Sequence, residues 1–222
     1  MLSAATLVTG RIKGVKRPAI GAILPGYDHP VLLMDVGANA DCKPEMLLQF
    51  AKIGSAYMTS VYGVKQPKVG LLNIGEEEEK GSSFAVETHK LLAKKLSNFE
   101  GNCEGRDLML GPFDVVVCDG FSGNVALKTI EGTGKLMMKM LKDAFMSSPK
   151  GKVSALLLNS QLKKLKKTTD SEEQGGSPLL GTKGVFVIGH GSSGAKGIKN
   201  GIFEAAKTVR ADLEKTIENA LK

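Results

Sequence analysis

The sequence is poor in aromatic residues: it has no tryptophan, and aromatic residues make up only 5% of its 222 residues. Glycine is abundant by contrast, with 27 residues. This balance favours a fold with many turns between strands and helices over a sandwich of two sheets with an aromatic core. Apolar residues still make up 42% of the chain, which is enough to bury a core.

Cysteines and long apolar runs are also scarce. The three cysteines, Cys42, Cys103 and Cys118, are odd in number and contain no C-x-x-C pair. Neither a disulfide framework nor a zinc site is favoured, and we expect no metal. No apolar run approaches the roughly 18 residues of a membrane span, and the first residues lack the basic segment that opens a signal peptide. We therefore expect a soluble cytoplasmic protein.

The excess of positive charge comes from a single segment. The net charge is +7, from 30 Lys and Arg against 23 Asp and Glu. Residues 139–167 contain eight lysines and one acidic residue, Asp143, so this segment accounts for the whole excess. A nucleic-acid-binding domain is often basic over much of its surface. We therefore expect no nucleic-acid partner.

Hydrophobic patterning predicts an α/β fold. Apolar segments rich in β-branched residues and ending in glycine occur at 31–37, 69–75, 115–120 and 185–189. Strands that are apolar on both faces are typical of a parallel sheet covered by helices. Helical patterns occur at about 4–12, 44–60, 82–96, 122–146 and 195–220. Because strands and helices alternate, we expect a layered α/β domain.

Polar residues and glycine follow three of the predicted strands, at 35–39, 119–124 and 189–194. In such sheets ligands bind beyond the carboxyl ends of the strands. We therefore expect these three turns to form one site.

The third turn reads GHGSSGAK over residues 189–196 and opens a helix. Free N–H groups and the helix dipole favour an anion there. The nucleotide-binding pattern GxxxxGK[ST] fails by one residue, because an alanine separates the last glycine from the lysine. We interpret His190 as a general acid or phosphate donor, although a plain turn capped by serine is the alternative. The candidate phosphate ligands are Gly191, Ser192 and Ser193.

The other two turns contribute further candidates. Lysines there could neutralise a phosphate, and asparagines could donate hydrogen bonds to an oxyanion. Asn124 and Lys128 are the catalytic candidates, and Asn124 could alternatively be a helix cap. The substrate-binding candidates are Asn39, Asp41, Lys43, Asp119 and Gly123.

Residues 147–178 are predicted to form a helical insertion that leaves the sheet and returns to it. Val153–Lys167 has an amphipathic pattern, but its first half is apolar almost all round. A helix that pairs in an oligomer, a tip in an anionic membrane surface and a helix packed on the core all fit this pattern. The residues expected to contact a membrane or a partner are Leu156, Leu157, Lys163, Lys164, Lys166 and Lys167.

Several longer segments together resemble one family. They are 35–39 (DVGAN), 41–45 (DCKPE), 69–78 (VGLLNIGEEE), 80–81 (KG), 104–107 (EGRD), 115–128 (VVVCDGFSGNVALK), 178–181 (PLLG) and 190–193 (HGSS). In these segments the chain resembles the phosphate acyltransferase family of bacterial phospholipid synthesis, over essentially its whole length.

The resemblance implies a single domain over residues 1–222 with a three-layer α/β/α fold and a mostly parallel sheet, similar to phosphotransacetylases and to isocitrate and isopropylmalate dehydrogenases. It implies transfer of a fatty acyl group from acyl carrier protein to inorganic phosphate, without a cofactor, by a homodimer at the cytoplasmic face of the membrane. In this family the inserted helical tip is associated with the membrane.

The resemblance also implies a strand with an Asp-Ala-Met-Gly-Gly-Asp motif and a Ser-Ala-Gly-Asn-Thr-Gly loop before the matched segments, so the chain is expected to lack the N-terminal part of the domain. Two other functions stay open. One is a phosphotransacetylase-like enzyme that uses acyl-CoA, and the other is an inactive dimeric scaffold at the membrane.

Overall fold

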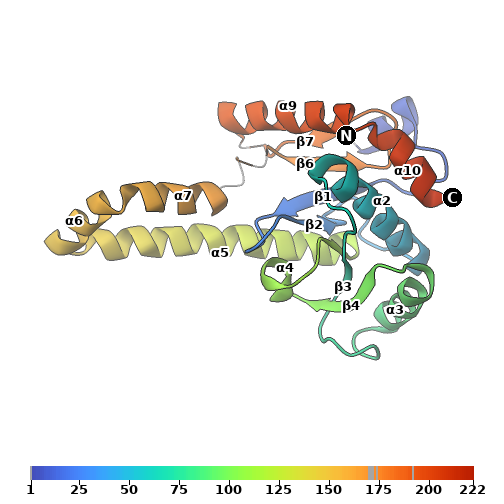
Figure 1. Ribbon diagram of the computed structural model, residues 1–222, viewed down its shortest axis with the longest axis horizontal. Helices are drawn as coiled ribbons and strands as arrows, with labels where there is room; N and C mark the ends of the chain where they lie inside the picture. The colour runs from blue at the N-terminus through green and yellow to red at the C-terminus, as the bar shows by residue number, and fades with distance from the viewer. Residues whose placement is uncertain (1, 170–172, 174, 192) are drawn as a thin grey trace.

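A seven-stranded sheet forms the centre of the computed structural model, which describes residues 2–169, 173, 175–191 and 193–222 (Figure 1). The strand order is β4-β3-β5-β2-β1-β6-β7. The strands are β1 (Ala19–Leu24), β2 (Val31–Met34), β3 (Val69–Asn73), β4 (Phe99–Glu104), β5 (Val115–Val117), β6 (Ser177–Leu180) and β7 (Phe186–Ile188).

The sheet has a parallel part and an antiparallel part. Strands β2, β5, β3 and β4 are parallel, with Met34 opposite Val117 and Val69 opposite Val115. Strands β1, β6 and β7 continue the sheet from β2, and each is antiparallel to the strand before it. The predicted α/β class is confirmed.

Helices cover both faces of the sheet. The helices of the described residues are α1 (Leu2–Ala4), a π-helical turn η1 (Ala5–Thr9), α2 (Pro44–Tyr62), α3 (Ser83–Lys95), α4 (Asp107–Leu110), α5 (Gly120–Met146), α6 (Pro149–Leu157), α7 (Asn159–Thr169), α9 (Ala195–Arg210) and α10 (Leu213–Leu221). The helix predicted for about 4–12 ends at Thr9. The helix predicted for about 195–220 is divided at Asp212, which has a φ of 46°.

The main core lies between the sheet and α2. Helix α2 begins with Pro44 in its first turn, where proline needs no hydrogen-bond partner. It ends at Gly63, whose φ of 75° is favourable for glycine. Between them, Phe50 and Tyr57 are fully buried against the sheet. All four residues of β2 are also buried, as the apolar pattern of that strand predicts.

Strand β7 differs from the prediction. Residues 185–189 are predicted as a strand with both faces covered, but β7 is a half-buried strand at the sheet edge, antiparallel to β6. Strand β7 runs antiparallel to β6 because the chain reverses its direction tightly between the two strands. Gly181 and Gly184 adopt φ values of 96° and 73° there, which favour glycine.

Helix α5 extends well beyond the sheet. Its 27 residues make it about 40 Å long, and only its first turns pack on the sheet (Figure 1). Its second half, α6 and α7 form a protruding helical tip, in which α6 and α7 contact α5. The single helix predicted over 153–167 is divided at Leu158. Within the described residues, no helix is both long and apolar enough to cross a bilayer.

Candidate functional site

The turn after β2 is organised around the buried carboxylate of Asp35. This carboxylate accepts hydrogen bonds from the backbone N–H groups of Gly37 (3.1 Å), Ala38 (3.0 Å) and Asn39 (2.7 Å). The Asn39 side chain donates to the same carboxylate (2.8 Å) and to the carbonyl oxygen of Pro18 (2.9 Å). Asn39 therefore holds the turn in place.

The turn after β5 packs closely against this first turn. Asp119 is the N-cap of α5, where its carboxylate accepts hydrogen bonds from the backbone N–H and the hydroxyl of Ser122, both at 2.8 Å. A Cβ at Gly123 would lie 1.9 Å from the carbonyl oxygen of Asp35, so only glycine fits there. These contacts fix the start of α5, and with it the side chains that follow on the helix.

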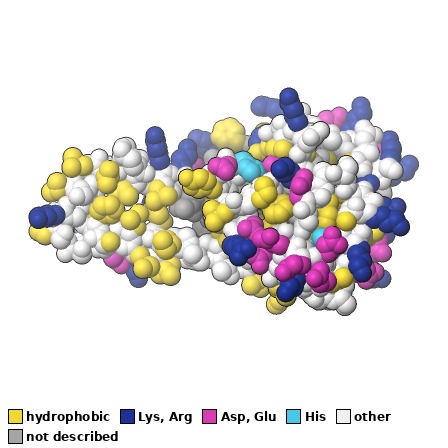
Figure 2. Space-filling model, turned by 60° about the horizontal axis from the view of Figure 1, so that its bottom comes forward, with side chains coloured by type: hydrophobic (Ala, Val, Ile, Leu, Met, Phe, Trp, Pro, Cys, Tyr) yellow, Lys and Arg dark blue, Asp and Glu magenta, His cyan; other side chains and the backbone are white. Residues whose placement is uncertain are grey.

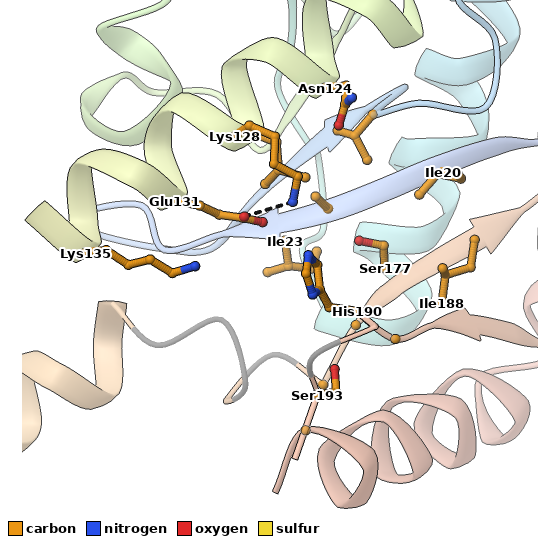
Figure 3. A pocket seen from close by; sticks show the side chains of 17 residues that line it. Ile20, Ile23, Asn124, Lys128, Glu131, Lys135, Ser177, Ile188, His190 and Ser193 are labelled. Carbon is orange, nitrogen blue, oxygen red and sulfur yellow. Dashed lines mark hydrogen bonds and ion pairs between the residues drawn. The ribbon is translucent and has the colours of Figure 1, made fainter. Parts of the chain in front are cut away.

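A pocket of about 260 Å³ lies beside α5 (Figure 3). One wall comes from α5, the floor includes side chains of β1, and the opposite wall comes from the start of β6 and the loop after β7. The polar side chains that line it are Asn124, Lys128, Glu131, Lys135, Ser177, His190 and Ser193. Four of the predicted site residues thus share one pocket, namely Asn124, Lys128, His190 and Ser193.

Two lysines supply positive charge in this pocket. The side chain of Lys128 is half exposed, and its ammonium group forms an ion pair with Glu131 at 2.8 Å, one helical turn away (Figure 3). Lys135 lies one further turn along the same wall. An anion that enters the pocket would meet both ammonium groups, and it would compete with Glu131 for Lys128.

His190 approaches this pocket from the loop after β7. The N–H of Ser193 donates to the carbonyl oxygen of His190 (2.9 Å), and α9 begins at Ala195. Gly191 belongs to this loop but does not line the pocket. Ser192, a predicted phosphate ligand, lies outside the described residues.

The three predicted turns do contribute to one pocket, through Val36, Asn124 and the loop that carries His190. The expectation that all three follow strand ends on the same side of the sheet is wrong for β7. Because β7 is antiparallel to β6, its carboxyl end lies at the opposite edge of the sheet from those of β2 and β5. The loop after β7 instead faces the side of α5 and lines the pocket together with that helix. The predicted site residues that do not line the pocket are Asn39, Asp41, Lys43, Asp119, Gly123 and Gly191.

The turn at 39–43 also contains a thiol. Burial and, to a smaller extent, the nearby carboxylate of Asp35 together raise the pKa of Cys42 to about 12. At neutral pH the thiol keeps its proton, so it is a poor nucleophile. Lys43 is an exposed residue at the start of α2.

Sequence reasoning missed three polar residues of the pocket. Glu131 and Lys135 continue the spacing of three or four residues that begins with Asn124 and Lys128, which is the signal for one helix face. Ser177 begins β6, a strand that the apolar pattern did not predict because two of its four residues, Ser177 and Pro178, break the apolar run.

A buried polar contact between helices supports the loop that carries His190. The hydroxyl of Tyr57 on α2 donates to the carboxylate of Glu204 on α9 (2.5 Å). The ammonium group of Lys207 lies 3.6 Å from the ring centroid of Tyr62. Burial raises the pKa of both tyrosines, so they remain hydrogen-bond donors. This contact fixes α9 on α2, and α9 directly follows the loop.

A group of acidic side chains lies elsewhere on the body. Glu76, Glu104 and Asp107 have carboxylate oxygens within 4.8 Å of one another. The guanidinium group of Arg106 lies 3.2 Å from Glu76 and 2.6 Å from Glu104, so a cation already balances this group.

Comparisons with known proteins agree with this fold. The model of the family described as "Fatty acid synthesis protein" matches residues 1–216. A phosphate acyltransferase of Campylobacter jejuni (strain 81-176) is 47% identical over 220 residues, which cover 99% of this chain and 67% of the relative. A phosphate acyltransferase of Clostridium acetobutylicum is 49% identical over 205 residues, covering 92% of this chain and 62% of the relative.

A third phosphate acyltransferase, from Parasynechococcus marenigrum, is 52% identical over 198 residues and matches over 88% of this chain and 46% of its own length. The chain thus spans about half to two thirds of these relatives. A phosphotransacetylase from Streptococcus pyogenes shares the fold, with a TM-score of 0.58 at 16% identity, over 93% of this chain and 58% of that protein. The family match over nearly all of the sequence shows that the chain belongs to the phosphate acyltransferase family.

Proposed function

We propose that the protein transfers a fatty acyl group from acyl carrier protein to inorganic phosphate and so forms acyl phosphate for phospholipid synthesis. The observation that supports this most is the pocket in which Lys128, Lys135, Asn124 and His190 come together. Lysine side chains and the N–H groups of a glycine-rich loop are suited to an anion such as phosphate. The family membership supplies the acyl transfer chemistry.

In the proposed reaction, a phosphate oxygen attacks the thioester carbonyl carbon. The new C–O bond forms, the C–S bond then breaks, and the thiolate leaves with the bonding electron pair. Lys128 would neutralise the phosphate, while the amide of Asn124 and the ring of His190 would donate hydrogen bonds to the oxyanion of the tetrahedral intermediate. A thiol has a pKa near 8.5, so its departure needs no strong acid. Catalysis then depends mainly on positioning the two reactants.

The helical tip supports a proposed location at the cytoplasmic face of the membrane. Leu156 and Leu157 at its end are each 77% exposed, so the interpretation as a helix packed on the core is wrong. Figure 2 shows hydrophobic side chains gathered along this protrusion, with lysines among them. Inserted leucines with lysines at anionic headgroups are typical of peripheral membrane binding. The lysines proposed for this contact are Lys163, Lys164, Lys166 and Lys167.

The tip also supports proposed contacts with protein partners. Leu136, Met137 and Met140 on α5 are exposed apolar residues apart from the end of the tip. An exposed apolar surface of this kind is typical of an interface, and we assign it to a homodimer. The surplus of lysines over 139–167 would complement an acidic carrier protein.

The test is an assay with palmitoyl-[acyl carrier protein] and phosphate, in which hydroxylamine traps acyl phosphate. We expect acyl phosphate to form only when both inorganic phosphate and the protein are present. Lys128→Ala and His190→Ala should each lower the rate at least about tenfold, which is a loss of roughly 1.4 kcal/mol of transition-state stabilisation. The matched control is Lys90→Ala, an exposed lysine of α3 outside both the pocket lining and the basic segment, which should leave the rate unchanged.

Two results would overturn the proposal. Product from palmitoyl-CoA but not from the carrier-protein thioester would indicate a phosphotransacetylase-like enzyme. No product from either donor, with binding to vesicles retained, would indicate a scaffold.

A further inference from the structure

Glu131 is a pocket residue that the reaction proposed above does not use. Among the described residues that line the pocket beside α5, it is the one acidic side chain. Its carboxylate lies 2.8 Å from the ammonium group of Lys128, and 23% of its side chain is exposed. Figure 3 shows this carboxylate on the side of α5 that faces His190. A site assigned to an anion thus contains a negative group of its own.

Stabilisation of the helix by an ion pair does not explain this arrangement. On an exposed helix, a glutamate stabilises most when it pairs with a lysine four residues later, and even then the gain is small. Lys135 has that position, yet the carboxylate of Glu131 pairs with Lys128. An anion that binds Lys128 therefore lies directly beside the carboxylate.

The protons of a tetrahedral anion decide how it interacts with a neighbouring carboxylate. At neutral pH inorganic phosphate keeps at least one P–OH group, which can donate a hydrogen bond to a carboxylate oxygen. Sulfate has a similar shape and size but keeps no proton. A carboxylate accepts hydrogen bonds and donates none. Beside sulfate it would gain no hydrogen bond and would face a like charge, which repels it.

We propose that Glu131 makes the pocket selective for a protonated oxyanion, so that the pocket binds phosphate and rejects sulfate; this inference rests on the proposed function, which places phosphate at Lys128. The two lysines of the pocket attract either anion. A P–OH group of phosphate donates to Glu131, which leaves an ionised phosphate oxygen free to attack the thioester carbonyl. Glu131 is therefore a specificity-determining residue.

The experiment measures the binding of sodium phosphate and sodium sulfate by isothermal titration calorimetry at neutral pH. About 0.15 M sodium chloride is present, so that distant charges are screened. The wild type should bind phosphate at least about tenfold more tightly than sulfate, because a site built to accept a ligand's hydroxyl group rejects an analogue that lacks it. Arsenate, which also keeps a proton at this pH, should bind like phosphate.

Replacement of the carboxylate by an amide should abolish this preference. Glu131→Gln has nearly the same shape, but its neutral amide can donate a hydrogen bond to either anion. We expect the affinities of this variant for sulfate and phosphate to lie within about threefold of each other, mainly because sulfate binds more tightly than it does to the wild type.

Two further variants separate the carboxylate from general effects of charge and folding. Glu131→Asp keeps a carboxylate at this position and should retain a preference for phosphate. Glu87→Gln removes an exposed carboxylate of α3 outside the pocket lining, and it should leave both affinities unchanged. Thermal melts check that each variant is folded.

Two results would overturn the inference. One is a wild type that does not prefer phosphate to sulfate. The other is a folded Glu131→Gln protein that keeps the full preference, which would reduce Glu131 to a helix partner of Lys128. Acyl transfer is assayed separately. Selective phosphate binding without formation of acyl phosphate would contradict the proposed reaction and leave the selectivity standing, so the two failures are distinguishable.

Discussion

At the scale of single residues, the carboxylate of Asp35 supports the turn on which the start of α5 rests. It is fully buried and accepts hydrogen bonds from four backbone N–H groups and from the side chain of Asn39. Gly123 packs against the carbonyl oxygen of the same residue. Asp35 thus positions Asn124 and Lys128 indirectly, through the turn and the helix that packs on it.

Removing this carboxylate should destabilise the protein strongly. In Asp35→Ala several buried N–H groups lose their acceptor, and each unsatisfied group costs about 1–3 kcal/mol. We expect the free energy of unfolding to fall by at least about 3 kcal/mol in urea titrations. Asp41→Ala, an exposed carboxylate of the next turn, is the control and should change it little. Equal stability of the two variants would contradict the role given to Asp35.

The buried thiols give the stability a pH dependence. Burial raises the pKa values of Cys42 and Cys103 to about 12 each, with nearby carboxylates adding to the effect. Unfolded thiols lose their protons near pH 8.5, so above that pH the unfolded state binds fewer protons than the native state. The free energy of unfolding should therefore fall as the pH rises from about 9 towards 12, by about 1.4 kcal/mol per pH unit for each thiol.

Urea titrations between pH 8 and 10.5 measure this fall. The variant Cys42→Ala/Cys103→Ala should show a smaller fall over the same range. A stability that stays constant between pH 8 and 10.5 in the wild type would contradict the protected state of these thiols. Rapid alkylation of these thiols in the native protein at pH 8 would also contradict it.

At the scale of the elements, α5 combines two environments in one helix. Its first turns lie against the sheet and present Asn124 and Lys128, while its last turns expose Leu136, Met137 and Met140 on the protruding tip. Because this part of α5 extends beyond the sheet, the sheet does not cover its apolar residues. Helices α6 and α7 pack beside it instead, and both contact it. The helix therefore connects the polar pocket to the proposed membrane contact.

The membrane contact is testable at the end of the tip. Leu156→Glu/Leu157→Glu should release the protein from vesicles that contain anionic lipid, because charged residues do not insert. Salt should weaken binding by the wild type, since each lysine near the surface contributes about 1 kcal/mol that ions screen. Sedimentation with vesicles measures binding, and a thermal melt checks the fold.

The control for this variant is Val209→Glu, an exposed apolar residue of α9 on the body. It should bind vesicles like the wild type. Two results together would assign the leucines to packing or to a dimer interface instead. The wild type would not bind vesicles, and the double variant would unfold or dissociate into monomers.

Long elements with regular patterns were predictable from the sequence. Helix α2 was expected at about 44–60 and occupies Pro44–Tyr62, because its apolar spacing and Pro44 are both local signals. Strands β1, β4 and β6 were missed. Strand β4 contains glycine, asparagine and glutamate, so it lacks an apolar run, and its place in the sheet depends on its pairing with β3.

At the scale of the whole molecule, the candidate site joins segments that are distant in the sequence. The wall from α5 and the loop that carries His190 are separated by the entire tip. The motifs predicted which of these segments carry polar groups. They could not predict that β7 runs antiparallel, because strand direction depends on the reversal at Gly181–Gly184 and on pairing with β6. The sequence also grouped residues 39–43 with the site, but of the turn after β2 it is Val36 that lines the pocket.

The binding of inorganic phosphate to this chain tests the central claim most directly. Calorimetric titration should show that Lys128→Ala binds phosphate at least about tenfold more weakly than the wild type, a difference of about 1.4 kcal/mol. Lys43→Ala should bind like the wild type, because Lys43 does not line the pocket. Weakened binding in Lys43→Ala together with normal binding in Lys128→Ala would contradict the account and would place the phosphate at the turn after β2.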